Sequence, residues 1–423
     1  MGAANNGILW RSKIPRGNGP EGQKDDREGL GRHRANAARD SGVARIGESG
    51  TSGRRGRPGE VSGLLAPAAW IFRAGVACRS AAYRRQWLSA RHLRQPVVSV
   101  GNLSVGGTGK TPFVEYLAKL LVARGRKPAI LTRGYRRKRS ADLVVIESAS
   151  RRSPDPRVVG DEPALLARRL PCVPIVVSAD RYRAGRVAEE RFEVDTHILD
   201  DGFQHLGLAR TLDIVLLDAT EDYDAGLLPV GRLREPLSAL ARAQVVILTR
   251  TKASAGGLGD PAERLEPQAE RIQTLATHWA PNARLFRAVT ESAGAWTVPD
   301  DVNPNGGAIH ELPLQACFAF CGVGNPQAFF RDLQGWGVHL AGQRVFPDHH
   351  RYSPKDLADL EKAARASGAA AILTTEKDAM NLLGIEPGGL PILACPMNMR
   401  LAEEEAFEEA LFSILGGVAL KAS

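Results

Sequence analysis

Residues 104–111 form a glycine-rich segment whose residue types suit phosphate chemistry. The segment comprises Ser104, Val105, Gly106, Gly107, Thr108, Gly109, Lys110 and Thr111, after an apolar run and before a helical one. Glycines let backbone N–H groups turn toward phosphate oxygens, a helix N-terminus adds partial positive charge, and the lysine and threonine can reach phosphates and Mg²⁺. The general phosphate-loop pattern has glycine at the position of Ser104. A chance glycine turn is the alternative, and the strand-then-helix context favours the phosphate loop.

Two acidic residues, Asp200 and Asp201, follow another apolar run and end a predicted strand. An acid at the carboxyl end of a strand beside a phosphate loop is where such enzymes hold Mg²⁺, directly or through water. The same pair could instead be turn acids that cap the next helix. Because the chain also carries a phosphate loop, we expect a metal role.

A third acid, Asp161, opens a predicted helix within Gly160-Asp161-Glu162-Pro163. One interpretation is that it caps this helix. The other is that its carboxylate accepts the proton of a hydroxyl group that is being phosphorylated, although positioning and charge neutralisation supply most of the rate. The residues alone leave both interpretations open.

Arginines and histidines recur in predicted loops where anions could bind. The arginines are Arg133 and Arg136 near Tyr135, Arg181 and Arg183 around Tyr182, and Arg232 and Arg234 before Glu235. Arginine suits bidentate contact with phosphate, but most surface arginines are only solvated charges. Residues 346–352 place His349 and His350 side by side in another loop. No third ligand with suggestive spacing accompanies them, so we do not expect zinc there.

Short β-branched runs separated by helical lengths predict an α/β fold, with a parallel sheet of P-loop NTPase type covered on both faces. The expected strands lie at 96–101, 128–133, 174–178, 196–200, 213–218 and 245–250. The cycle restarts at 317–324, 370–378 and 390–395, which indicates a second, smaller α/β domain. We therefore expect a P-loop domain at 96–285, an interdomain linker at 286–315 and the smaller domain at 316–423.

The positive charge is concentrated at the front of the chain. The formal net charge is +9, and residues 61–95 alone hold six arginines and no acid. Residues 1–60 are rich in glycine, arginine and serine, lack the apolar core of a secretory signal and are expected to be a disordered extension. This distribution fits an anionic membrane surface better than nucleic acid. The five cysteines form no CxxC pair, as expected in a reducing cytoplasm.

Residues 61–95 are predicted to form an amphipathic helix that associates with a membrane. The apolar cluster at residues 64–72 is shorter than the ~20 residues that span a bilayer. Trp70, Tyr83 and Trp87 stand among arginines, a combination that suits the headgroup region. The alternative is a helix that packs on the protein body and exposes a basic face.

Nine segments, in order, resemble the tetraacyldisaccharide 4'-kinase family of lipid A synthesis. They are VGNLSVGGTGKTP, LTRGYRRK, VGDEPALLARR, SADRYRAG, ILDDGFQHLGLARTLDIVLLDA, LLPVGRLREPLSAL, CGVGNP, FPDHHRYS and LTTEKDAMNL. The resemblance runs from about residue 61 to about residue 400, and its DDGFQH and REP elements are specific to that family. Ser104 is the family's own form of the loop.

The resemblance implies ATP-dependent phosphorylation of the 4'-hydroxyl of a tetraacyldisaccharide 1-phosphate at the cytoplasmic face of the bacterial inner membrane. It implies ATP and Mg²⁺ as cofactors, a glycolipid and an anionic membrane surface as partners, and no nucleic acid. Lys110 would contact phosphates, Asp161 would be the base, and His349 or His350 would assist it from the smaller domain.

The resemblance also implies the remaining site residues. The metal would be held by Thr111, Asp200, Asp201 and Glu235. The substrate or nucleotide would be contacted by Tyr135, Arg181, Gln204, His205 and Arg234.

Two other classes of protein share some of these features. A P-loop GTPase or metallochaperone would have the same loop and strand-end acids, but also an N/T-K-x-D element for guanine. Residues 251–254 read Thr-Lys-Ala-Ser and end without the carboxylate that element needs. A nucleotide-binding scaffold without activity would not need the acids, adjacent histidines and arginines together.

Overall fold

The structure is a computed structural model that describes residues 58–135, 142–147, 154–251, 266–298, 315–382, 385 and 388–419. The disordered extension expected at residues 1–60 lies outside the described residues except for its last three. Lys252 to Ser254, which bear on the guanine element, also lie outside them.

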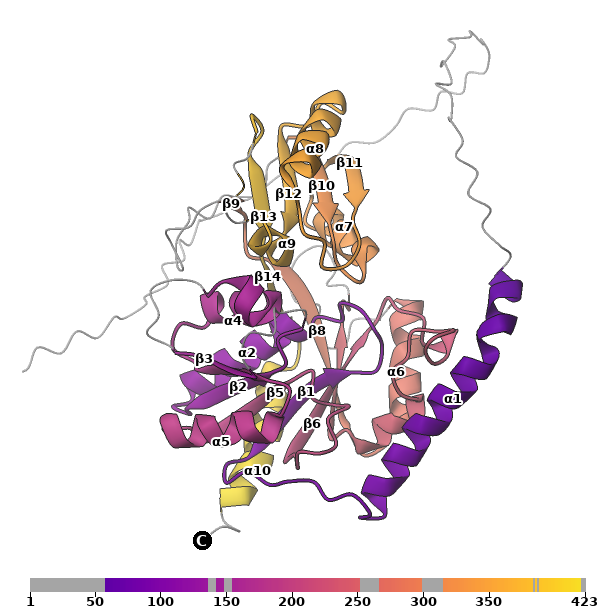
Figure 1. Cartoon of the computed structure of the whole chain (residues 1–423), viewed down its shortest axis with the longest axis vertical. Helices are drawn as coiled ribbons and strands as arrows, with labels where there is room; N and C mark the ends of the chain where they lie inside the picture. Colours follow the sequence, from indigo (N-terminus) through magenta and orange to yellow (C-terminus); the bar gives the residue numbers. More distant parts are fainter. Residues whose placement is uncertain are drawn as a thin grey trace, which may run out of the picture. The chain divides into compact units, whose positions relative to one another are not determined.

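A large, mostly parallel sheet forms the body of the P-loop domain (Figure 1). Its strands are β1 (Val97–Asn102), β2 (Pro128–Thr132), β3 (Leu143–Ile146), β4 (Ile175–Ser178), β5 (Thr196–Asp200), β6 (Leu212–Asp218), β7 (Val245–Thr249), β8 (Arg284–Ser292) and β14 (Met397–Leu401). Within the described residues the order across the sheet is β14-β8-β7-β6-β1-β5-β2-β4-β3. The pairs are parallel except β3 with β4 and β14 with β8. The predicted α/β class and parallel sheet are therefore confirmed.

Helices cover both faces of this sheet. They are α2 (Lys110–Ala123), α3 (Pro156–Val159), α4 (Asp161–Arg169), α5 (Arg181–Arg191), α6 (Pro267–Trp279) and α10 (Glu404–Ala419), with the 3₁₀ turns η1 (Tyr223–Ala225) and η2 (Leu237–Arg242). Apolar residues of α2, α4 and α10 share one core with the sheet, and those of α5 and α6 pack on its other face. Successive strand residues point to opposite faces, so a strand covered on both sides reads as a continuous apolar run.

The smaller domain has its own sheet and core. Its strands are β9 (Trp296–Val298), β10 (Cys317–Cys321), β11 (Leu340–Val345), β12 (Ala371–Thr375) and β13 (Ile392–Cys395), and its helices are α7 (Pro326–Gly335), α8 (Pro354–Ala366) and α9 (Glu376–Met380). Among the described residues the strand order is β11-β10-β12-β13-β9, with β9 antiparallel to β13. Cys317 and Cys321 are buried in this core, as their place in an apolar strand predicts.

The domain boundaries differ from those expected at 286–315 and 316–423. The chain leaves the smaller sheet at the end of β13, and after Pro396 it forms β14, which pairs with β8 of the large sheet. Helix α10 then packs on the large sheet. Phe407 of α10 meets Phe113 of α2 at a ring-centroid distance of 5.9 Å. The expected linker contains two real strands, β8 in the large sheet and β9 in the smaller one. The chain therefore crosses between the domains twice.

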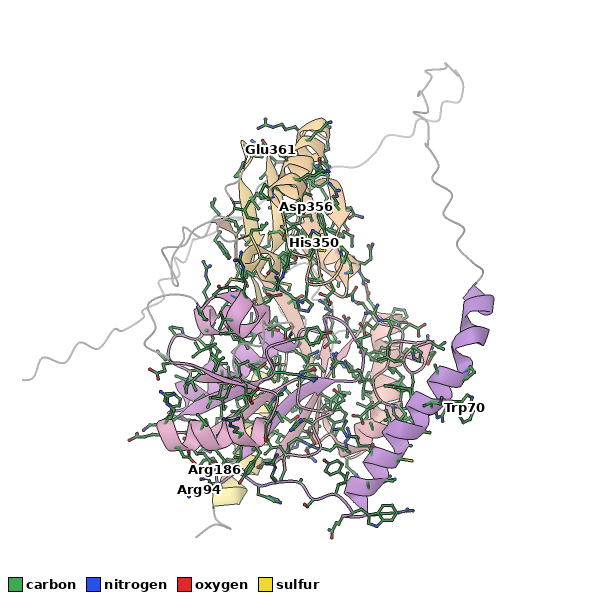
Figure 2. All side chains as sticks on the ribbon, viewed as in Figure 1. Trp70, Arg94, Arg186, His350, Asp356 and Glu361 are labelled. Atoms are coloured by element: carbon green, nitrogen blue, oxygen red, sulfur yellow. The ribbon has the colours of Figure 1, made fainter. Side chains whose placement is uncertain are left out.

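A long helix, α1 (Pro58–Arg84), precedes the first strand. Its side chains Trp70 and Ile71 are 70% and 74% exposed, and Figure 2 shows Trp70 directed away from the helix. At its C-terminal end, Arg79 Nη2 donates to the backbone oxygen of Gln204 at 2.9 Å. No described helix is both long and apolar enough to cross a membrane.

Candidate active site

The glycine-rich loop lies between β1 and α2, with its carbonyl oxygens held from outside. The bonds run from Arg232 Nη2 to Val105 O (2.8 Å), from Arg250 Nη1 to Gly107 O (2.9 Å) and from Thr249 Oγ1 to Thr108 O (3.0 Å). In a trans peptide the carbonyl and the next N–H point in opposite directions. The N–H groups of Gly106 and Gly109 therefore face the inside of the loop, where a phosphate would accept them.

Lys110 is the first residue of α2 and stands at the mouth of this loop. Its Nζ atom lies 3.1 Å from Oδ1 of Asn102, the last residue of β1, and 3.4 Å from Oδ1 of Asp201. Only 13% of its side chain is exposed. The lysine is thus held in place by groups that a phosphate could replace.

Ser104 has a structural reason to stand where the general pattern has glycine. Its Oγ atom donates to Oε2 of Glu221 at 2.5 Å, and both residues are buried. Burial raises the pKa of Glu221, and the bond from Ser104 opposes that rise. The hydroxyl therefore satisfies an acid that lies directly beneath the loop.

The two strand-end acids occupy different electrostatic environments. Asp200 is buried, accepts from Thr132 Oγ1 at 2.9 Å, and has a pKa raised to about 7 by burial and by the charge of Glu162. For Asp201, desolvation raises the pKa, but Lys110 and Arg234 outweigh it and lower the value to about 2. The Nη1 atom of Arg234 lies 2.7 Å from Oδ2 of Asp201. The structure thus brings these acids to the base of the phosphate loop.

The side chains around the phosphate loop suit a Mg²⁺ ion that is shared with a bound phosphate better than a metal site made entirely of protein ligands. Within the described ranges, no group of three or more His, Cys, Asp or Glu side chains could hold a metal ion. Mg²⁺ usually keeps several waters and is bound by one or two carboxylates together with substrate phosphates. Thr111 and the two strand-end acids fit that requirement. Glu235 is buried and its carboxylate pairs with Arg242 at 2.7 Å.

Asp161 does not cap its helix. The N-cap of α4 is Gly160, and Asp161 is the first helical residue. Its Oδ2 atom accepts from His349 Nδ1 at 2.9 Å and from Asn381 Nδ2 at 3.3 Å. Desolvation raises the pKa of Asp161, but these two bonds and the charge of Lys377 outweigh it and lower the pKa. The carboxylate is therefore held ionised and points at the smaller domain.

Gly160 is needed because the chain passes very close to a neighbouring loop. Its φ is 99°, in the region that favours glycine, and an added Cβ would lie 3.1 Å from Cα of Gly134. This contact places the start of α4 beside Tyr135, whose ring centroid is 5.5 Å from that of His349. The acid, the histidine and the tyrosine consequently form one cluster.

The two adjacent histidines have separate surroundings. His349 adopts a left-handed conformation (φ 59°), donates its backbone N–H to Gly322 O at 3.0 Å and contacts Asp161. His350 stacks on Phe346 at 4.7 Å and lies 3.3 Å from Asp356 Oδ2, within the smaller domain (Figure 2). Only His349 of the pair touches Asp161.

The remaining predicted substrate residues lie around Asn102 and the strand-end acids. Gln204 Nε2 donates to the backbone oxygen of Asn102 at 2.9 Å. Arg181 is buried, donates to Ser178 O at 2.6 Å, and has a pKa lowered to about 10 by burial. Burial and the charge of Arg181 lower the pKa of His205 to about 4, so this imidazole is neutral at pH 7.

The smaller domain touches the phosphate loop directly. A Cβ on Gly324 would lie 3.0 Å from Cα of Gly106, so a larger residue there would push against the loop. Arg232 Nη2 lies 3.3 Å from Gly324 O. Arg250, whose side chain is 9% exposed, pairs with Asp218 and lies 3.6 Å from Asp332 Oδ2 of α7. Atoms of both domains therefore meet at the loop.

Sequence reasoning missed several residues of this site. Asn102, Arg250, Lys377 and Asn381 all contact residues that it singled out. Asn102 lies two residues before the loop segment, and Lys377 and Asn381 are four residues apart after an apolar strand. That spacing places both side chains on one helical face, a signal that could have been used.

The comparisons with known proteins agree with one another. The sequence pattern of the family described as Tetraacyldisaccharide-1-P 4'-kinase matches residues 61–416. A tetraacyldisaccharide 4'-kinase of Koribacter versatilis is 39% identical over 356 residues, covering 82% of this chain and 98% of that protein. One of Anaeromyxobacter dehalogenans is 41% identical over 334 residues, covering 78% and 84%.

A solved structure agrees with these relatives in fold. The crystal structure of LpxK from Aquifex aeolicus in complex with ATP matches with a TM-score of 0.61 at 30% identity, over 84% of this chain and 99% of that one. On the extent of these matches, this chain belongs to the tetraacyldisaccharide-1-P 4'-kinase family.

Proposed function

We propose that this chain transfers the γ-phosphoryl group of ATP to the 4'-hydroxyl of a tetraacyldisaccharide 1-phosphate, with Asp161 as the base. Membership of the family supports the reaction and the lipid A precursor as substrate. The observation that carries the assignment of the base is the contact between Asp161 and His349, made where both domains meet the phosphate loop. When bound, Mg·ATP supplies the phosphoryl group and a metal charge that offsets the charge on it.

The loop would bind the nucleotide through backbone and side chain together. The N–H groups of Gly106 and Gly109 and the start of α2 offer donors to phosphate oxygens. The ammonium of Lys110 lies beside Asn102 and Asp201, contacts that it would exchange for phosphate oxygens. Residues 104–111 therefore form the proposed ATP site.

The acceptor proton would pass to one oxygen of Asp161. Within the described part of the chain, the hydrogen bonds to this carboxylate from His349 and Asn381 both go to Oδ2. Oδ1 is left to receive the proton of the 4'-hydroxyl. Because His349 holds the other oxygen, the carboxylate cannot rotate freely, and orientation is a large part of what a base contributes.

Thr111, Asp200 and Asp201 are the residues we propose for Mg²⁺. Their donor atoms are a hydroxyl and two carboxylates, which suit this ion. Glu235 was predicted to join them from the family resemblance. Its pairing with Arg242 means that a metal role would require it to exchange that partner.

We propose that the acceptor lies against Tyr135, Arg181, Gln204, His205 and Arg234. Tyr135 is 57% exposed beside His349, so its ring can contact a ligand near the base. Gln204 and His205 lie next to the end of α1, through the bond from Arg79. This contact supports a lipid site that extends from the base toward the C-terminal end of α1.

Helix α1 and the residues just after it form the segment we propose to dock on the cytoplasmic face of the bacterial inner membrane. Trp70, Ile71 and Trp87 are each about 70% exposed or more. Exposed aromatic and apolar residues among arginines bind anionic lipid surfaces through burial and charge together. A lipid substrate would thereby remain in the bilayer while its sugar reaches the base. We propose no nucleic-acid partner.

The test is transfer from γ-labelled ATP by the detergent-purified full chain with Mg²⁺. The acceptor is a tetraacyldisaccharide 1-phosphate, and the controls are GTP in place of ATP and a reaction without lipid. Labelled lipid formed with ATP and lost in Lys110→Ala supports the proposal. Nucleotide hydrolysis without labelled lipid would refute it.

A further inference from the structure

Arg250 contacts the phosphate loop and the smaller domain with one side chain. Its Nη1 atom donates to the backbone oxygen of Gly107 at 2.9 Å and also bonds to Oδ2 of Asp218. Its Nε atom lies 3.6 Å from Oδ2 of Asp332 on α7. The side chain of Asp218 is completely buried, and that of Arg250 nearly so. One guanidinium therefore lies between the loop, the end of β6 and the smaller domain.

The peptide that Arg250 holds belongs to the turn of the phosphate loop. The N–H of the same peptide, on Thr108, donates to the backbone oxygen of Gly106 at 3.2 Å. Because a peptide unit is planar, the bond from Arg250 also fixes the direction of this N–H. The backbone around it is intrinsically adaptable, since glycine adopts many conformations. A contact from outside the loop can therefore decide which loop conformation is populated.

The contact between Arg250 and the smaller domain is incomplete. Nε of Arg250 and Oδ2 of Asp332 are both buried, and neither makes a hydrogen bond to any other residue that the structure describes. They carry opposite charges, and their separation of 3.6 Å is just beyond hydrogen-bond distance. An unpaired buried donor or acceptor costs free energy. A small approach of α7 toward the loop would satisfy both atoms at once.

A second arginine makes a comparable contact from another side of the loop. Arg232 Nη2 donates to Val105 O at 2.8 Å, and it lies 3.3 Å from Gly324 O and 3.5 Å from Glu221 Oε1. Its side chain is 46% exposed, and its partner in the smaller domain is a backbone oxygen. The link through Arg250 is buried and ends on a side-chain acid. It is therefore the stronger of the two links, and substitution of that acid can test it.

We propose that Arg250 is a positioning residue that makes the affinity of the phosphate loop for ATP depend on Asp332 of the smaller domain. This inference rests on the proposed ATP site at residues 104–111. The guanidinium is planar and rigid, so its contacts with Asp332 and with Gly107 cannot change independently. By linkage, if Asp332 strengthens the binding of ATP, then ATP strengthens the contact of α7 with Arg250 by the same factor.

The first experiment measures nucleotide affinity without turnover. The full chain is titrated calorimetrically with the β,γ-methylene analogue of ATP and Mg²⁺, in the absence of lipid. Asp332→Asn removes the charge at constant size, and the affinity should fall about fivefold, as for the loss of one ordinary hydrogen bond. Asp359→Asn, at an exposed position of α8, is the matched control and should bind as the wild type does. Wild-type affinity in Asp332→Asn would overturn the proposal.

A double-mutant cycle shows whether Asp332 acts through Arg250. Arg250→Lys keeps the charge, but one ammonium cannot replace the fork that contacts three partners, and the affinity should fall about tenfold. Asp332→Asn should then add little in the Arg250→Lys background. Losses that simply multiply would show two independent structural effects and would contradict the proposal. Asp332→Asn leaves Arg250 paired with Asp218, so it tests the link even if Arg250→Lys does not fold.

The second experiment measures the reverse effect, from the nucleotide to the smaller domain. Amide hydrogen exchange of α7 is followed with and without the same analogue at saturation. The analogue should slow this exchange in the wild type and in Asp359→Asn, and clearly less in Asp332→Asn. A substitution that only weakened the fold would speed exchange equally in both conditions. An equal response of wild type and Asp332→Asn to the analogue would overturn the proposal.

These measurements separate the inference from the proposed function. If the analogue binds with the expected dependence on Asp332 but no lipid is labelled, the proposed acceptor is wrong and the role of Arg250 stands. If lipid is labelled while nucleotide affinity is unchanged in Asp332→Asn, the proposed function stands and the role of Arg250 is wrong.

Discussion

Nδ1 of His349 lies 2.9 Å from Oδ2 of Asp161, and the two residues come from different domains and are 188 positions apart in the chain. Neither domain contains this pair alone. Formation of the proposed base therefore requires the contact between α4 and the loop that comes after β11. Substitutions at Asp161 and at the adjacent histidines therefore test this contact between the domains.

The adjacent histidines should respond differently to the same substitution. His349→Asn removes the partner of Asp161 and should lower kcat by roughly a hundredfold, within the range for positioned acid–base groups. His350→Asn removes a ring stacked on Phe346 and should cost about 1–2 kcal/mol of unfolding free energy. Steady-state kinetics and denaturant unfolding of both variants show which substitution lowers kcat and which lowers the free energy of unfolding. A larger kinetic loss for His350→Asn would reverse the assignment.

The stabilising effect of Asp161 should disappear in acid. Its pKa in the folded protein is lowered from the ordinary value of 3.8, so the unfolded chain binds a proton at higher pH than the folded one. The contribution is fully present above pH 3.8 and is lost as the pH falls through the folded-state pKa. The difference in unfolding free energy between wild type and Asp161→Asn should shrink below that pH. A difference that grows in acid would contradict the sign of the shift.

Arg169 should be important for the stability of the domain contact. It ends the helix that Asp161 begins and pairs with Glu115 of α2 at 3.1 Å and with Glu376 of α9. Arg169→Met removes the guanidinium shared by two largely buried carboxylates, leaving Glu376 without this ion pair and Glu115 with Lys119 alone, and should cost about 3 kcal/mol. Denaturant unfolding measures this cost.

The matched control for Arg169 is Arg186→Met, at a position labelled in Figure 2, which removes an exposed pair with Glu190. Exposed pairs of this kind contribute little. Equal effects of the two substitutions would argue against a special role for Arg169.

Substitution of the exposed residues of α1 should weaken membrane binding. Trp70→Ser together with Ile71→Ser removes exposed apolar surface that can enter the headgroup region, and binding to anionic vesicles should fall about tenfold. Val122→Ser, at a 41% exposed position of α2, is the control. Vesicle sedimentation with anionic and neutral lipids measures the apolar and the electrostatic contributions. Unchanged binding would indicate that α1 has another partner.

Local pattern was sufficient to predict the large sheet and the phosphate loop. Strands β4 and β7 are short runs rich in valine and isoleucine between turn signals, and their length and β-branched content favour a strand over a helix. The phosphate loop can be identified from the spacing of the glycines before Lys110, because that spacing is local in the chain and suits phosphate binding. Asp161 was ambiguous because capping and catalysis both need an aspartate at a helix start.

Features that depend on distant packing were not predictable in the same way. β14 is five residues long and became part of the large sheet because β8 offers it an edge. Lys377 and Asn381 belong to a five-residue helix and its C-terminal end. Their spacing places them on one helical face, but it does not show that they reach His349 and Asp161, which they do only when the domains meet. Arg250 follows a strand like many arginines, and its contacts with the loop come from its left-handed backbone.

The most direct test of the central claim is a double-mutant cycle on kcat with Asp161→Asn, His349→Asn and the combined variant. If the two residues act as one unit, the combined variant should be no slower than Asp161→Asn alone, with ATP affinity unchanged in all three. Losses that simply multiply, or full turnover by Asp161→Asn, would contradict it.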